Sequence, residues 1–162
     1  MDEEDKRIAK AVLDRLCKGA QIGGIFFGPI LQILVYKSNY EGESLTVPVN
    51  LTLTTSSWKV FKTRPTSFPN GEDELPEASQ DKQIKMICSI RERIITKVEL
   101  GETEPHLILT LDDERVVFVN GKDDYYECWD IVAGISGTGE TWNVVAYPSG
   151  GLAIWTPKTF VI

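Results

Sequence analysis

The chain has 162 residues, of which 42% are hydrophobic and 25% charged, and its formal net charge is −7. This length and composition favour one globular domain, residues 1–162, and exclude a disordered chain. The acidic balance argues against nucleic acid and against an anionic membrane as partners.

The N-terminus and the apolar runs indicate where the protein resides. Residues 2–5 are all acidic, whereas a secretory leader would begin with basic residues. The longest apolar stretch, residues 22–36, contains three glycines and Pro29 and is too short to span a bilayer. We therefore expect a cytoplasmic protein.

Cysteine and histidine content limits the chemistry available. Cys17, Cys88 and Cys128 are widely spaced and form no CxxC motif, which favours reduced thiols over disulfides or a zinc site. His106 is the only histidine, so a Ser-His-Asp or Cys-His site would have to use it. It has no nucleophile motif beside it and is more simply explained as structural. We predict no bound metal and no cofactor.

Residues 1–19 are predicted to form an N-terminal helix. Ile8, Val12 and Leu16 recur at four-residue steps and make one apolar stripe, which predicts that the helix packs on a sheet. Acids at the start and Lys18-Gly19 at the end are typical helix boundaries.

Residues 22–61 are predicted as a first β-repeat. The glycines after Ile22 and Pro29 indicate a kinked or edge strand. Residues 30–36 are expected to continue this strand, and further strands are expected at 45–53 and 58–61.

Residues 62–83 differ in kind, with three prolines, five acids and little periodic apolar content. We predict a mobile loop that joins two repeats. A loop of this length is either dispensable or functional, and the sequence favours neither.

Residues 84–155 are predicted as a second β-repeat that ends in a hairpin. Strands are expected at 94–100, 107–111, 116–119, 125–133, 142–147 and 152–155. Turn signals separate them at Asp112-Asp113, Asn120-Gly121, Gly134–Glu140 and Pro148–Gly151. The third of these has the glycine spacing of a phosphate-binding loop, but Glu140 replaces the required lysine and a strand follows, so we interpret it as a hairpin turn.

Two segments of the chain resemble each other. Leu51–Phe61 aligns with Leu109–Val119, and each follows another apolar run. The duplication predicts an α+β fold: a mostly antiparallel β-sheet or half-open barrel built from two related β-meander repeats, with one N-terminal helix.

The negative charge is concentrated in residues 102–140, which hold ten acids and two bases. Acids mixed with aromatic residues suit a surface that binds a basic protein, because acids steer the partner and aromatic side chains anchor it. The simpler alternative is a solvated face, with Trp129 in the core and the acids outside. The candidate partner-binding residues are Asp112, Asp113, Glu114, Asp123, Asp124, Tyr125 and Glu127.

Residues 94–155 resemble a class of small, uncharacterised bacterial proteins of immunity-protein type. The resemblance is carried by Leu109-Thr-Leu-Asp-Asp113, Asn120-Gly121, Tyr126-Glu-Cys-Trp-Asp-Ile131 and Pro148-Ser-Gly-Gly151. It implies a protein that binds and blocks a toxin without catalysis.

We therefore predict a non-enzymatic protein-binding module, an immunity-type inhibitor whose acidic surface masks a basic partner such as a toxin. A homodimer through exposed sheet edges is compatible with this prediction. One alternative is a small-ligand-binding barrel whose cavity is lined by Trp58, Tyr126, Trp129 and Trp142. A second alternative is an enzyme that uses His106 or a carboxylate.

Overall fold

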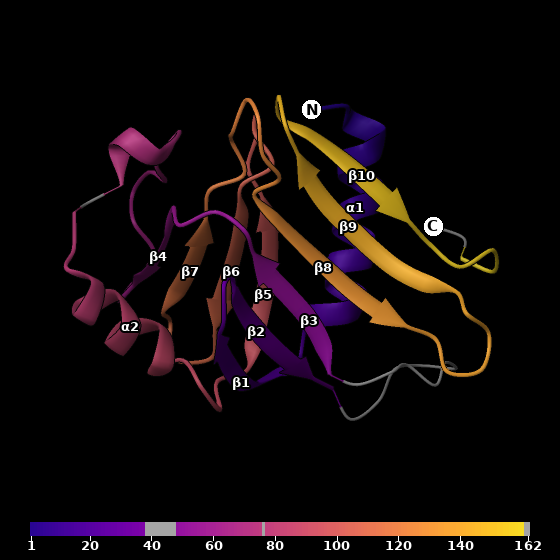
Figure 1. Ribbon diagram of the computed structural model, residues 1–162, viewed down its shortest axis with the longest axis horizontal. Helices are drawn as coiled ribbons and strands as arrows, with labels where there is room; N and C mark the ends of the chain where they lie inside the picture. The colour runs from indigo at the N-terminus through magenta and orange to yellow at the C-terminus, as the bar shows by residue number, and fades with distance from the viewer. Residues whose placement is uncertain (38–47, 76, 161–162) are drawn as a thin grey trace.

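A computed structural model describes residues 1–37, 48–75 and 77–160 (Figure 1). These residues form an α+β fold with two α-helices, one short 3-10 helix and ten strands. The helical elements are α1 (Glu3–Cys17), η1 (Glu72–Glu74) and α2 (Gln80–Cys88). The strands are β1 (Gln21–Phe27), β2 (Leu31–Tyr36), β3 (Val49–Leu53), β4 (Trp58–Phe61), β5 (Ile95–Leu100), β6 (Leu107–Leu111), β7 (Val116–Val119), β8 (Trp129–Gly134), β9 (Thr141–Tyr147) and β10 (Gly151–Trp155).

The strands form two antiparallel sheets. A six-stranded sheet has the order β1-β2-β3-β8-β9-β10, and a four-stranded sheet has the order β4-β7-β6-β5. The sheets meet at one corner, where Gln21 bridges to Ile94 and the Ile22 amide donates to the Arg93 carbonyl at 2.9 Å. The strands do not close into a barrel.

Helix α1 packs between the sheets and lies behind β8, β9 and β10 in Figure 1. It contacts β5 of the four-stranded sheet and β9 and β10 of the six-stranded sheet. The predicted apolar stripe is confirmed: Val12, Leu13 and Leu16 are fully buried. The Asp2 side chain accepts from the first-turn amides, and Gly19 leaves the helix with φ +79°.

The two related segments do not build two equivalent meanders. The second copy forms the continuous meander β5-β6-β7, but in the first copy β4 leaves β3 and pairs with β7. The turn before β4 explains the departure, because the amides of Thr54 and Thr55 both donate to the Cys128 carbonyl at 2.9 Å. The chain is thereby diverted from the six-stranded sheet, and the two copies pair with each other.

The prediction of a mobile loop over residues 62–83 is wrong where η1 and the start of α2 fold. Phe68 stacks on Phe118 of β7 with ring centroids 5.7 Å apart, and Arg64 pairs with Glu99 of β5 at 2.6 Å. Residue 76 lies outside the described residues, as do residues 38–47, which include the first part of the strand expected at 45–53. Neither described α-helix has the length and apolarity that a membrane crossing requires.

The hairpin turns at Asp112-Asp113, Gly134–Glu140 and Pro148–Gly151 are confirmed. The tight turn expected at Asn120-Gly121 is wrong, because this dipeptide begins a long connection that carries the chain from β7 to β8 in the other sheet. The strand expected from residue 125 begins only at Trp129. The three cysteines are free thiols, with Cys17 and Cys128 buried and Cys88 exposed.

Candidate functional site

The seven predicted partner-binding residues lie at opposite ends of the four-stranded sheet. Asp112, Asp113 and Glu114 form the turn that enters β7, whereas residues 123–127 lie in the connection that leaves it. A strand separates the two groups, so they cannot form one continuous acidic surface. Arginines lie beside Asp113 in the first group, whereas further acids lie beside Asp123 and Asp124 in the second.

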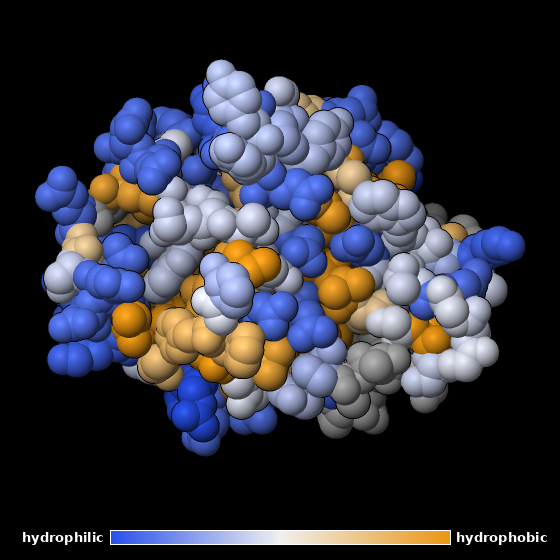
Figure 2. Space-filling model, in the orientation of Figure 1, coloured by the Kyte–Doolittle hydropathy of each residue, from blue (hydrophilic) through white to orange (hydrophobic). Residues whose placement is uncertain are grey.

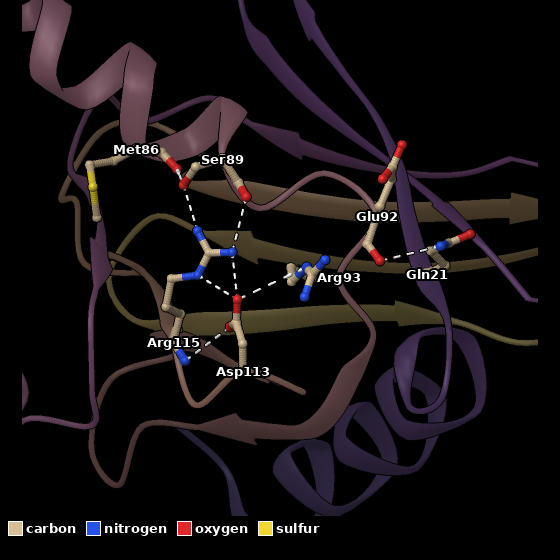
Figure 3. A network of polar contacts seen from close by, with 7 residues as sticks. All are labelled: Gln21, Met86, Ser89, Glu92, Arg93, Asp113 and Arg115. Atoms are coloured by element: carbon tan, nitrogen blue, oxygen red, sulfur yellow. Dashed lines mark hydrogen bonds and ion pairs between the residues drawn. The ribbon is translucent and has the colours of Figure 1, made fainter.

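Asp113 belongs to a polar network that holds α2 in place (Figure 3). The Arg115 guanidinium donates to the Asp113 carboxylate at 2.6 Å and to the Ser89 carbonyl at 3.0 Å, just after the end of α2. Arg93 lies 4.0 Å from the same carboxylate. The hydrogen bond from Arg115 lowers the pKa of Asp113, and the Arg93 charge acts in the same direction. Two arginines therefore offset the charge at this end.

The connection that contains Asp123 is fixed by its own hydrogen bonds. The Asp123 carboxylate accepts from the amides of Tyr125 and Tyr126 at 2.7 and 2.9 Å, an arrangement that favours a turn over a strand. The Asp123 carbonyl accepts from the Ser149 amide in the β9–β10 turn at 2.9 Å. The Asn120 side chain bonds both main-chain groups of Lys122. These hydrogen bonds hold the loop in one conformation.

His106 connects this loop to the segment before η1. Its Nδ1 accepts from the Gly121 amide at 3.0 Å, and it also hydrogen-bonds the Asn70 backbone. Burial lowers the pKa of His106, so the neutral ring is favoured. Gly121 must remain glycine here, because a Cβ atom would lie 2.1 Å from the Pro105 carbonyl oxygen. The only histidine therefore has a structural role in this geometry.

An acidic hollow lies between η1 and the loop that contains Asp123. It has a volume of about 340 Å³ and is lined by Asn70–Glu74 and Lys122–Asp124. Lys122 is the only base among these lining residues, and it pairs with Glu104 at 3.3 Å. The backbone amide of Asn70 lowers the pKa of Glu74 by donating to its carboxylate. The negative charge of the hollow is therefore largely unopposed.

Two tyrosines stand beside this hollow in solvent. Tyr125 is 82% exposed and Tyr126 is 71% exposed, although the loop that carries them is hydrogen-bonded. Glu127, also exposed, follows them. We define the acidic end as Glu72–Glu74 together with Asp123–Glu127.

Sequence reasoning found half of the acidic end. It selected Asp123, Asp124, Tyr125 and Glu127 from their local composition, but it missed Glu72–Glu74. These three acids belong to the segment interpreted as a loop, some fifty residues earlier in the chain. Their density of charge was the available signal, and nothing local connected it with the later cluster.

The aromatic residues expected to line a ligand cavity lie in different environments. Trp129 and Trp142 are fully buried in the core, and the Trp129 indole donates to the Pro105 carbonyl at 2.8 Å. Tyr126 is exposed, and Trp58 lies on a separate groove beside α2. In the part of the chain that the structure describes, no group of three or more His, Cys, Asp or Glu side chains is placed to hold a metal ion.

Comparison of the chain with protein-family models, with curated proteins and with solved structures finds no match.

Proposed function

We propose that the protein is a non-enzymatic protein-binding module whose acidic end receives a basic surface of its partner, as an immunity-type inhibitor would mask a toxin. One observation carries the proposal: Tyr125 and Tyr126 project into solvent from a loop held rigid by hydrogen bonds and surrounded by carboxylates. Because both tyrosines are exposed, they add no buried surface to the core. Stabilisation of the fold therefore does not explain their position.

Anchoring, steering and preorganisation would each favour binding at the acidic end. Tyrosine is enriched at the energetic centres of interfaces because it buries a large surface with few rotatable bonds. The surrounding carboxylates speed association with a basic partner and weaken the binding of acidic competitors. Because Asp123 already fixes the loop, little conformational entropy is lost on binding.

The test is affinity capture of a tagged protein from native lysate, at low and high salt, with wild type and two variants compared by mass spectrometry. We expect wild type to retain a basic protein at low salt and to release it at high salt. The double variant Tyr125→Ser/Tyr126→Ser should lose that protein, because removing an interface anchor costs about 2 kcal/mol or more. Purified partner and calorimetry then give the affinity of each variant.

Charge reversal at the two ends of the sheet supplies a matched control. Asp73→Lys/Asp124→Lys changes the acidic end, and Asp112→Lys/Glu114→Lys makes the same charge change at the arginine-compensated turn. The first variant should release the partner and the second should retain it. Equal loss from both would point to net charge alone, and equal retention by both would overturn the proposal.

A further inference from the structure

A groove runs along the outer edge of β4, away from the acidic end. β4 is the terminal strand of the four-stranded sheet and pairs with β7 on one side only, as far as the described residues extend. Helix α2 stands beside β4 on the other side (Figure 1) and contacts this strand. A strand edge beside a helix is the arrangement in which an added strand can be held.

The register of β4 shows which backbone groups face the groove. The Asn120 amide donates to the Ser57 carbonyl at 2.9 Å, which marks these residues as a hydrogen-bonded pair. In an antiparallel ladder such pairs alternate, so Lys59 and Phe61 direct their backbone groups toward β7. The N–H and C=O of Val60, between them, therefore point to the open edge, as does the C=O of Trp58.

The groove has the lining of a peptide site. Its enclosed part has a volume of about 230 Å³, with an apolar wall from Trp58, Val60 and Met86. It continues past Trp58 into a wider polar hollow of about 680 Å³ that includes Ser56 and Ser57. Glu72 and Glu77 also line that hollow, so only the enclosed part, which follows the strand edge from Trp58 to Lys62, is free of acids. This length of edge accommodates an extended segment of a few residues.

The hydrophobic surface continues beyond the groove. Figure 2 shows apolar residues gathered over the β1–β2 hairpin and α2, at the lower left of the view. Exposed side chains there include Phe27, Ile30 and Ile84, which line a hollow that also includes Trp58. A contiguous apolar surface on a strongly charged protein is typical of a binding site.

The charge of the enclosed part is positive. Lys59 and Lys62 come from the strand side and Lys82 from α2, and no acid is among its lining residues. Burial lowers the pKa of Lys59, and the charge of Lys82 lowers it further, so the two walls place their lysines within electrostatic reach of each other.

We propose that this groove binds an extended, acidic segment of a partner protein as an additional strand on β4, with its carboxylates beside Lys62 and Lys82. The backbone of Val60 supplies one donor and one acceptor to the added strand. Trp58 and Met86 cover its apolar side chains. The inference does not depend on the proposed function, since the acidic end would repel such a segment.

The test uses two fluorescein-labelled, N-acetylated seven-residue peptides, one with alternating valine and glutamate and one with alternating valine and lysine. Fluorescence polarisation should show that the glutamate peptide binds, that rising salt weakens it, and that the lysine peptide does not bind. Amide hydrogen exchange should slow at Val60 in the complex, because this N–H gains a partner. Binding of both peptides, or of neither, would overturn the proposal.

Three variants locate the site. Lys82→Glu should weaken the glutamate peptide about tenfold, whereas Lys85→Glu, on the same helix but outside the groove, should not. Val60→Pro removes the donor that faces the groove and leaves the β4–β7 ladder intact, so it should abolish binding. If Val60→Pro fails to fold, the comparison of Lys82→Glu with Lys85→Glu tests the proposal by itself.

Sedimentation of the free protein distinguishes a second copy from a partner segment. A monomer is expected at the concentrations used for the peptide titration. A dimer that Lys82→Glu dissociates would assign the groove to a second copy of this chain and overturn the acidic-segment proposal.

Discussion

At the scale of single residues, His106 connects the two segments that make up the acidic end. Its ring accepts from Gly121, where the acidic loop begins, and it bonds the Asn70 backbone, next to η1. Both halves of the acidic end are therefore held by one buried side chain. The ring can accept from Gly121 only while Nδ1 carries no proton.

We predict that His106→Leu lowers the free energy of unfolding by about 1–3 kcal/mol at pH 7.5, because the buried Gly121 amide loses its acceptor. The pKa of His106 is lowered in the folded state, so its contribution to stability is present above the unfolded value and is lost as pH falls through the folded value. The stability gap between wild type and variant should therefore narrow at pH 5.

Urea unfolding at the two pH values measures this gap. Acid effects that are common to both proteins cancel in the difference. A gap that is the same at pH 7.5 and pH 5 would mean that the ring is not held neutral by its burial.

At the scale of elements, α2 depends on contacts that are distant in sequence. Only Ile87 of its nine residues is buried, so most of the helix faces solvent or the groove. Its end is anchored by Arg115, which bonds Ser89 and Asp113 together. A short helix with one buried residue is not stable by itself, which is why the anchor matters.

We predict that Arg115→Met lowers the free energy of unfolding by about 1–3 kcal/mol and speeds amide exchange in α2 more than in β6. The substitution keeps an apolar stem but removes every hydrogen-bond donor that Arg115 contributes to the network. Arg91→Met is the matched control, because Arg91 is exposed. Equal effects from both substitutions would mean that the network in Figure 3 does not hold the helix.

The elements that local sequence determines are those that sequence reasoning found. α1 carries its own stripe and boundary residues, and the Asp112-Asp113 turn carries its own turn chemistry. β4 and α2 are different, because their positions follow from contacts with Cys128 and Arg115, which are distant in the sequence. Periodicity in a single segment contains no information about such partners.

The candidate site also has one part that local sequence predicts and one part that only the fold reveals. Asp123–Glu127 could be selected from composition alone, although the strand expected there was wrong because Asp123 bonds the next two tyrosine amides. Glu72–Glu74 could be added only once the fold had placed η1 beside the loop. The spacing of residues in the sequence also could not predict that two arginines offset the negative charge of Asp113.

At the scale of the whole molecule, both sheets and α1 share one hydrophobic core. A single cluster of buried residues includes Leu51 of the six-stranded sheet, Leu109 of the four-stranded sheet and Leu13 of α1. The lysine-lined groove and the acidic end lie on opposite sides of η1, whose Glu72 lines hollows on both. Both surfaces therefore depend on the same hydrophobic core, and a partner bound at either surface would act on that core.

The shared core predicts that the two sheets unfold together. Leu13→Ala should lower the free energy of unfolding by about 2–5 kcal/mol, because it leaves a cavity between α1 and the sheets. Amide exchange under native conditions should show the same loss of protection at Leu51 and at Leu109, since each reports one sheet. Lys10→Ala, on the outer side of α1, should change both by less than about 0.5 kcal/mol. Loss of protection at Leu51 with Leu109 unchanged would mean that residues 1–162 form two folding units, because a single cooperative domain transmits a core defect to every strand that packs on it.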